Sequence, residues 1–372
     1  MILKTGTFSG MAQDIINSDN KIILFGVGVV GSTITPEILK EHSLLDRVLC
    51  CIDNDKTRWN TFINMYGRKI KVFSPEILTE VQDKITILVT ISRYGSALEQ
   101  LKSMKGIAEF SCYIIPALCI NSYHSKGGKG ILKMSTKPLI PKKIHYMWLG
   151  GKKIPEKLQH CIDSWKKYCP DYEIIRWDET NYDVHKNKFM AQAYDSQRYG
   201  FVPDYARLEI LYEHGGIYLD TDVELLRNID DLLYQEAFCS VEKWQVINFG
   251  GCSGAIKGHK SLEPFIESWS KRSLVRTDGT LDSISSGLID TSIALKEGYR
   301  INGKNQTVNG MNIYSYDYFH PYDYMSGKIE MTNDTFSIHQ FHGGWLDENT
   351  KKKNEEAIKA YDTLMGFAIN VG

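Results

Sequence analysis

The sequence predicts an α/β protein built from two consecutive domains, and three observations support this. The chain has 372 residues, which is more than one hydrophobic core usually spans. Short apolar runs alternate with helical stretches up to about residue 120, as in a parallel sheet flanked by helices. A lysine- and glycine-rich stretch without acidic residues follows. We therefore expect a first domain over residues 1–120, a linker over 121–143 and a second domain over 144–372.

In the first domain, the apolar runs at 21–25, 48–52, 85–90 and 111–115 are expected to be strands, with helices at 11–17, from Thr35 and at 96–104. The first strand runs into a G-x-G-x-x-G motif whose glycines are Gly26, Gly28 and Gly31, and Asp53 ends the second strand. This spacing is typical of dinucleotide-binding domains, in which the glycines allow a tight turn and a helix N-terminus faces the anion.

This first part also resembles the Rossmann-like domains of polysaccharide-synthesis proteins, through Ile52-Asp53-Asn54-Asp55 and Phe73-Ser74-Pro75-Glu76. The motif predicts a nucleotide site, with NAD as the first candidate. The resemblance leaves open whether the domain binds a nucleotide or only a partner protein.

Composition excludes several classes of protein. The 44 basic and 45 acidic residues nearly cancel, so the basic excess of a nucleic-acid-binding protein is missing. The sequence has no apolar run long enough to span a bilayer, and residues 1–20 lack the apolar core of a signal peptide. The eight cysteines form no C-x-x-C pair, which indicates reduced thiols. We therefore expect a cytoplasmic protein, with peripheral contact at the inner face of the membrane left open.

The linker has two interpretations. It contains lysines, glycines and prolines and no carboxylate, namely Lys126, Gly127, Gly128, Lys129, Gly130, Lys133, Lys137, Pro138, Pro141, Lys142 and Lys143. Such a composition is typical of a solvated connector. It would also suit contact with phosphates or anionic lipid.

In the second domain we expect a strand at 144–149, a helix at 154–168 and a strand at 172–177. Pro203 should open a helix that Gly215-Gly216 ends, and Asp204 and Arg207 should share one face of it. A strand at 217–223 should then carry Asp220 and Asp222 on the same side. Two adjacent carboxylates repel each other unless a cation lies between them, and oxygen ligands suit Mg²⁺ or Mn²⁺.

Five sequence blocks follow one another within residues 140–346: Ile144-His145-Tyr146-Met147-Trp148-Leu149-Gly150-Gly151, Ser164-Trp165-Lys166, Asp204-Tyr205-Ala206-Arg207-Leu208, Gly215-Gly216-Ile217-Tyr218-Leu219-Asp220-Thr221-Asp222 and Ile338-His339-Gln340-Phe341-His342-Gly343-Gly344-Trp345. With these blocks in this order, the second domain resembles the family 32 glycosyltransferases, which are D-x-D sugar transferases of capsule and polysaccharide synthesis. More distantly it is similar to the catalytic domain of the large glucosylating toxins.

The resemblance implies a GT-A fold, a UDP- or GDP-sugar donor, Mn²⁺ or Mg²⁺, and retention at the anomeric carbon. By position, Trp148 would stack on the nucleobase, with Tyr146 in the same donor-binding set. Asp204 and Arg207 would contact the donor sugar and diphosphate. Asp220 and Asp222 would hold the metal, and Trp345 would lie near the departing β-phosphate or the sugar.

The last block departs from the family pattern His-His-x-x-Gly-Ser-Trp, because Gln340 and Gly344 replace the second His and the Ser. Aligned on Trp345, the first His is His339, which we expect to be the third metal ligand, with His342 as the alternative.

The acceptor implied by the resemblance is a glycan or a lipid-linked glycan of a surface polysaccharide. The main alternative is an NAD-dependent nucleotide-sugar oxidoreductase, although residues 1–120 contain no Tyr-x-x-x-Lys. A non-catalytic scaffold is disfavoured by the intact acidic motifs. A glycoside hydrolase is disfavoured because its two carboxylates flank the scissile bond and need no metal.

Overall fold

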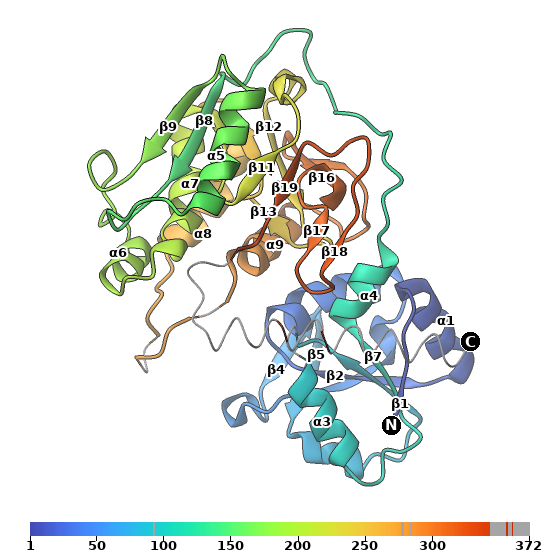
Figure 1. Ribbon diagram of the computed structural model, residues 1–372. Helices are drawn as coiled ribbons and strands as arrows, with labels where there is room; N and C mark the ends of the chain where they lie inside the picture. The colour runs from blue at the N-terminus through green and yellow to red at the C-terminus, as the bar shows by residue number, and fades with distance from the viewer. Residues whose placement is uncertain (92–93, 277–278, 283, 343–354, 356–358, 360–372) are drawn as a thin grey trace.

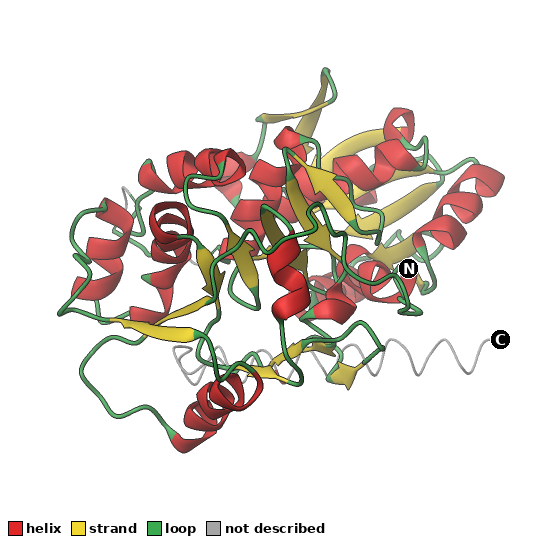
Figure 2. Cartoon of the chain, turned by 90° about the horizontal axis from the view of Figure 1, so that it is seen from above, coloured by secondary structure: helices red, strands yellow, loops and turns green. Residues whose placement is uncertain are grey.

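In the computed structural model, residues 1–91, 94–276, 279–282, 284–342, 355 and 359 are described. Two separate sheets organise the chain, and Figure 1 shows them as two bodies joined by the extended segment that follows α4. Helices flank the strands of both sheets, as the view from above shows (Figure 2).

The first sheet has seven strands in the order β1-β7-β6-β2-β3-β5-β4. Adjacent strands of this sheet are parallel, except that β4 and β5 are antiparallel. The strands are β1 (Ile2–Leu3), β2 (Lys21–Phe25), β3 (Val48–Ile52), β4 (Phe62–Met65), β5 (Arg68–Phe73), β6 (Ile85–Val89) and β7 (Ser111–Ile114). The helices are α1 (Phe8–Ser18), α2 (Thr35–Glu41), α3 (Gly95–Ser103) and α4 (Ile115–Ser122).

The central strands β2 and β6 are apolar runs because both of their faces are covered. Ile22 to Phe25 and Ile87 to Val89 are fully buried, as expected for parallel strands between two layers of helices. The expected strands of this part are confirmed to within one residue at their ends.

The second sheet has eight strands. Its path is β15-β16-β12-β14-β10-β8-β9, and β13 pairs with β12. The strands are β8 (Lys143–Met147), β9 (Glu173–Trp177), β10 (Gly216–Tyr218), β12 (Ala237–Val241), β13 (Ile247–Asn248), β14 (Ser253–Ala255), β15 (Gln306–Val308) and β16 (Met311–Tyr314). Two small sheets lie beside it: β11 (Val223–Leu225) with β19 (Ser337–His339), and β17 (Tyr322–Asp323) with β18 (Lys328–Ile329).

The helices of the second body are α5 (Glu156–Tyr168), α6 (Lys188–Asp195), α7 (Pro203–His214), α8 (Glu263–Ser270) and α9 (Ser286–Glu297). Pro203 occupies the first turn of α7 and Gly215 caps its end, as expected. Strands β9, β8 and β10 are parallel neighbours, so their carboxyl ends meet at one edge of the sheet. Ligands of open α/β sheets bind outside that edge.

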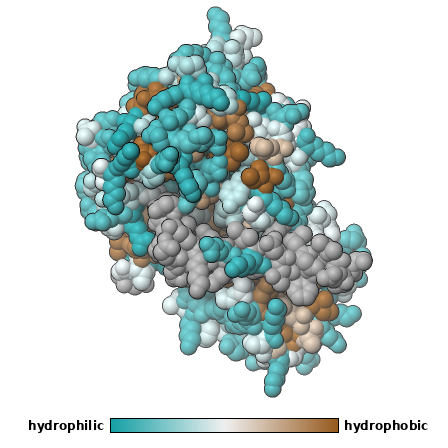
Figure 3. All heavy atoms as spheres, viewed as in Figure 1, coloured by the Kyte–Doolittle hydropathy of each residue, from teal (hydrophilic) through white to brown (hydrophobic). Residues whose placement is uncertain are grey.

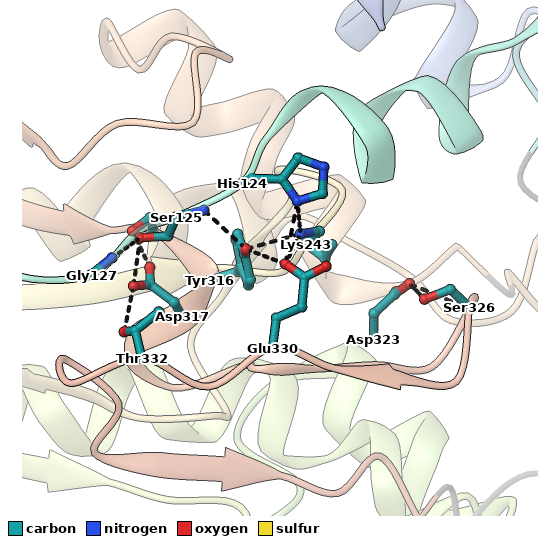
Figure 4. A network of polar contacts seen from close by, with 11 residues as sticks. His124, Ser125, Gly127, Lys243, Tyr316, Asp317, Asp323, Ser326, Glu330 and Thr332 are labelled. Atoms are coloured by element: carbon teal, nitrogen blue, oxygen red, sulfur yellow. Dashed lines mark hydrogen bonds and ion pairs between the residues drawn. The ribbon is translucent and has the colours of Figure 1, made fainter. Parts of the chain in front are cut away.

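The segment after α4 is extended, and hydrogen bonds tie it to the second body. Ser125 donates its backbone N–H to the Tyr316 hydroxyl (3.1 Å) and its own hydroxyl to Asp317 (2.6 Å). The buried Lys243 ammonium donates to the same Tyr316 hydroxyl (2.9 Å) and pairs with Glu330 (Figure 4). Burial lowers the pKa of Lys243, although Glu330 opposes that effect. The start of this segment is therefore fixed to the second body.

Two of the lysines of the segment form ion pairs. Lys133 pairs with Asp231, and Lys142 pairs with both Asp171 and Asp230. The face of the molecule seen in Figure 3 is mainly hydrophilic, with apolar side chains in small separate groups. Among the described residues, no helix combines the length and the apolar composition that crossing a membrane would take.

Candidate donor and metal site

Asp220 and Asp222 lie in a turn and not on a strand, which corrects the expected strand at 217–223. β10 ends at Tyr218 and β11 begins at Val223. Inside the turn, Val223 donates its N–H to the Asp220 carbonyl (3.0 Å), and Asp220 donates its own N–H to the Gly250 carbonyl (2.8 Å). The turn, and not the alternation of a strand, therefore brings the two carboxylates together.

The double glycine at the start of β10 has a steric cause. Gly215 and Gly216 have φ values of 64° and 108°, which side chains rarely adopt. A Cβ on Gly216 would lie 2.8 Å from Nε2 of His145. That nitrogen lies 2.8 Å from the Gly215 carbonyl oxygen, and Trp177 donates its Nε1–H to Nδ1 of the same ring. Burial lowers the pKa of His145 to about 4, so a neutral His145 anchors the chain as it enters the turn.

Helix α7 places Arg207 between two carboxylates. The guanidinium donates to Asp204, three residues earlier, and to Oδ2 of Asp220 (3.2 Å). Asp204 and Arg207 are only 6% and 5% exposed. Burial raises the pKa of Asp204 to about 6, with Arg207 opposing it. Burial alone would lower the pKa of Arg207, but Asp220 and Asp204 raise it. The shared helix face predicted for Asp204 and Arg207 is confirmed.

His339 completes a group of three potential metal ligands. β19 pairs with β11 so that His339 lies opposite Val223, the residue after Asp222. One ligand atom from each of Asp220, Asp222 and His339 lies within 4.8 Å of the others. Nε2 of His339 is 3.2 Å from Oδ1 of Asp222. Two carboxylates and one imidazole lie together at the end of the sheet, and these ligand types suit a divalent cation.

The two members of this ion pair shift each other's pKa. Burial would raise the pKa of Asp222, but the charge and hydrogen bond of His339 lower it to about 2. Burial would likewise lower the pKa of His339, but Asp222 raises it. A cation bound here would take the place of the His339 proton, because a metal ligand must be deprotonated.

The rest of the last block has other partners. His342 meets Asp222 through its backbone, since its N–H donates to Oδ2 (3.0 Å). Gln340 donates its side-chain N–H to Glu224 (3.1 Å). Of the two expected third ligands, the structure therefore places the imidazole of His339 in the group. Trp345 lies outside the described residues.

The two aromatic residues of the first block differ in their surroundings. Trp148 follows β8 and is partly buried, and its indole N–H donates to the Lys152 carbonyl (2.6 Å). Tyr146 is 8% exposed, and its ring packs edge-on against Trp165 at 5.5 Å. Trp148 thus keeps an accessible part next to the edge of the sheet, whereas Tyr146 belongs to the core.

The segment between β13 and β14 shapes the site, and the sequence reasoning did not single it out. A Cβ on Gly250 would lie 1.9 Å from Oδ2 of Asp220 and 2.4 Å from Nη1 of Arg207. Asn248 accepts hydrogen bonds from the N–H groups of Gly250 (2.8 Å) and Gly251 (2.9 Å). The available signal was Gly-Gly beside short apolar strands, which often marks a close approach to the backbone.

A buried carboxylate supports that segment in turn. Asn248 donates its side-chain N–H to Glu242 (2.8 Å), and Trp244 donates its indole N–H to the same carboxylate (2.6 Å). Burial raises the pKa of Glu242. Nothing in the local sequence marks Glu242, because its role depends on β12 and β13 pairing with each other.

In the first body, the glycine motif is explained largely by packing. A Cβ on Gly31 would lie 1.9 Å from the Gly26 carbonyl oxygen, whereas one on Gly28 would meet nothing within 4 Å. Asp53 accepts one hydrogen bond from Val27 N–H (2.8 Å) and another from Asp55 N–H (2.8 Å). The carboxylate expected to hold a ribose is therefore engaged by the glycine loop itself.

Parts of the chain are similar to known glycosyltransferases. Residues 155–239 match the family model described as "Glycosyltransferase sugar-binding region containing DXD motif". The chain is 32% identical over 135 residues to inositol phosphoceramide mannosyltransferase 3 of Schizosaccharomyces pombe, which covers 34% of this chain and 35% of that protein. It is 25% identical over 215 residues to an uncharacterised glycosyltransferase of Acanthamoeba polyphaga mimivirus, covering 56% of this chain and 84% of that protein.

Among solved structures, the chain is similar to the PaToxG glycosyltransferase with a TM-score of 0.29 and 21% identity, over 35% of this chain and 60% of that one. The match to the mannosyltransferase of Schizosaccharomyces pombe spans about a third of that protein's length. The family match contains α7 and the turn with Asp220 and Asp222. Residues 155–239 therefore resemble a glycosyltransferase sugar-binding region that contains a DXD motif.

Proposed function

We propose that the protein is a metal-dependent glycosyltransferase that moves a sugar from a nucleoside-diphosphate donor to a glycan acceptor. The observation that carries this proposal is the group formed by Asp220, Asp222 and His339, whose ligand atoms lie within 4.8 Å of one another. Arg207 lies against the same group through Asp220. A metal and an arginine side by side suit a diphosphate better than they suit any neutral ligand.

The residues would divide the work as follows. A cation held by Asp220, Asp222 and His339 would neutralise charge on the departing diphosphate, an effect worth several kcal/mol. Arg207 and Asp204 would hold the donor sugar and its phosphates. The Nε–H of Arg207 is buried without a partner among the described residues. This N–H could therefore donate a hydrogen bond to a phosphate oxygen of the sugar donor. Because the group includes an imidazole, and Mg²⁺ takes oxygen ligands, Mn²⁺ is the cation we favour.

For the donor we propose a UDP- or GDP-sugar whose base stacks on Trp148, with retention at the anomeric carbon by a same-face mechanism. In that mechanism the departing phosphate takes the proton of the acceptor hydroxyl, so no protein nucleophile is needed. Because the yeast relatives are named as mannosyltransferases, mannosyl donors are the first to screen beside the UDP-sugars.

For the acceptor we propose a surface or capsular glycan, free or lipid-linked, used at the cytoplasmic side of a membrane. Lys126, Lys129 and Lys137 of the segment after α4 are exposed. They would meet anionic lipid or phosphate if the acceptor is lipid-linked.

Asp222→Asn tests the proposal, because it removes one metal-binding charge and keeps the shape of the side chain. We expect Mn²⁺-dependent transfer, or hydrolysis of the donor, to be abolished while the protein stays folded, with an unfolding midpoint lowered by the loss of the ion pair with His339. Asp14→Asn is the matched control: it makes the same change in the first body, at a carboxylate that pairs with Lys4, and should retain activity. Full turnover by Asp222→Asn would refute the metal assignment.

A further inference from the structure

His320 is a buried histidine beside the proposed metal site. Its side chain is fully buried, and neither ring nitrogen has a hydrogen-bond partner among the described residues. Buried polar groups in proteins are nearly always paired, and each unpaired one costs roughly 1–3 kcal/mol. An apolar side chain would fill the same space without that cost. A histidine at this position is therefore expected to have a hydrogen-bond partner.

The neighbour of His320 is His339, which carries an unpaired nitrogen of its own. The two ring centroids are 5.3 Å apart, at an angle of 46°. His339 directs Nε2 toward Asp222 (3.2 Å), whereas its Nδ1 is buried and has no partner among the described residues. Buried ring nitrogens without a partner thus lie on two adjacent side chains, His320 and His339.

The surroundings keep His320 in this place. A Cβ on Gly251 would lie 1.9 Å from Cε1 of His320, so only glycine leaves room for the ring. Phe341 stacks on His339 with centroids 4.0 Å apart, and it lies 5.9 Å from the ring of His320. Gly251 is itself held by Asn248, through its N–H (2.9 Å). The segment that shapes the Asp220 side of the site therefore also fits the ring of His320.

We propose that His320 is a positioning residue, which accepts a hydrogen bond from Nδ1–H of His339 and so leaves the Nε2 lone pair facing the metal. One bridging water, or a rotation of either ring about its Cβ–Cγ bond, closes the hydrogen bond. A histidine ligand with its other ring nitrogen bonded has a fixed tautomer and orientation, and loss of that partner costs about 10–100-fold in metal affinity. This inference rests on the proposed metal site.

The test is direct Mn²⁺ binding without donor, measured by the electron paramagnetic resonance of free Mn²⁺ on the full-length protein. His320→Leu removes both nitrogens, and we expect it to weaken Mn²⁺ binding about 10–100-fold. His320→Gln keeps an acceptor and a donor, and should recover most of the affinity. His259→Leu is the matched control, because His259 is a buried histidine that contacts Ser261 and Glu236. We expect its Mn²⁺ affinity to equal that of the wild type.

The outcomes separate the two proposals. If the wild type binds Mn²⁺ and His320→Leu binds it equally tightly, the role of His320 is overturned and the metal site stands. If the wild type binds no Mn²⁺, the metal site itself is overturned. Should His320→Leu fail to fold, the comparison of His320→Gln with His320→Ala decides in the same way. At saturating Mn²⁺ the kcat of His320→Leu should approach that of the wild type, whereas loss of a direct ligand would keep it low.

Discussion

Gly250→Ala is the sharpest perturbation of the proposed donor site, because a single added methyl group meets two of its residues at once. The new Cβ would lie 1.9 Å from Oδ2 of Asp220 and 2.4 Å from Nη1 of Arg207, whereas ordinary contacts begin at 3.4 Å. The Asp220 carboxylate would therefore have to move by about 1.5 Å to restore ordinary contact. A 1 Å misplacement of a reacting or binding group can cost about 100-fold in rate. We expect at least that loss, which corresponds to about 2.7 kcal/mol of transition-state stabilisation.

The assay is kcat/KM for donor at saturating Mn²⁺, together with Mn²⁺ affinity and the thermal unfolding midpoint. Gly95→Ala is the matched control, because its Cβ would meet nothing within 4 Å and it opens helix α3. It should leave kcat/KM and Mn²⁺ affinity unchanged and should keep or slightly raise the unfolding midpoint, because alanine suits a helix better than glycine. If Gly250→Ala kept wild-type kcat/KM and Mn²⁺ affinity, Asp220 and Arg207 could not hold the reacting groups in the geometry described above.

Three further predictions concern other parts of the molecule. Trp148→Ala should raise the KM for donor more than it lowers kcat, since stacking on a base stabilises bound donor; an unchanged KM would count against stacking. Burial raises the pKa of Asp290 to about 7, so the folded protein holds this proton more tightly than the unfolded chain does, and the free energy of unfolding should fall as pH rises from about 4 to about 7. Asp290→Asn, which keeps an oxygen to accept the Trp269 N–H (2.7 Å), should reduce that fall in thermal unfolding measurements, and an identical pH profile would contradict this account. NAD should give neither heat in calorimetry nor a thermal shift, because Asp53 already bonds Val27 and Asp55; saturable binding that Asp53→Ala abolishes would show otherwise.

Much of the fold could be predicted from local sequence. The buried strands β2, β3 and β6 are continuous apolar runs, and a strand covered on both faces needs nothing else to be recognised. The ends of α7 follow from Pro203, which suits a first turn, and from Gly215, whose φ of 64° ends the helix. Each of these features depends on residues close together in the chain.

Part of the candidate site could also be predicted from residues close together in the chain. Asp204 and Arg207 are three residues apart on one helix, and their ion pair follows from helical geometry. The pairing of Asp220 with Asp222 was also predicted, but for the wrong physical reason. The Gly250 carbonyl accepts the N–H of Asp220 and holds the segment as a turn, and no local pattern places Gly250 beside it.

By itself, the sequence predicted which residues would carry the chemistry: an acidic pair behind a double glycine, an arginine on the preceding helix, and two histidines near the end of the second domain. Only the tertiary structure decided between those histidines. The register of β11 with β19 sets His339 opposite Val223, more than a hundred residues away along the chain. It leaves His342 to meet Asp222 through its backbone. His320 and Glu242 entered the site in the same way, because strand pairing and packing bring together residues that no sequence spacing relates.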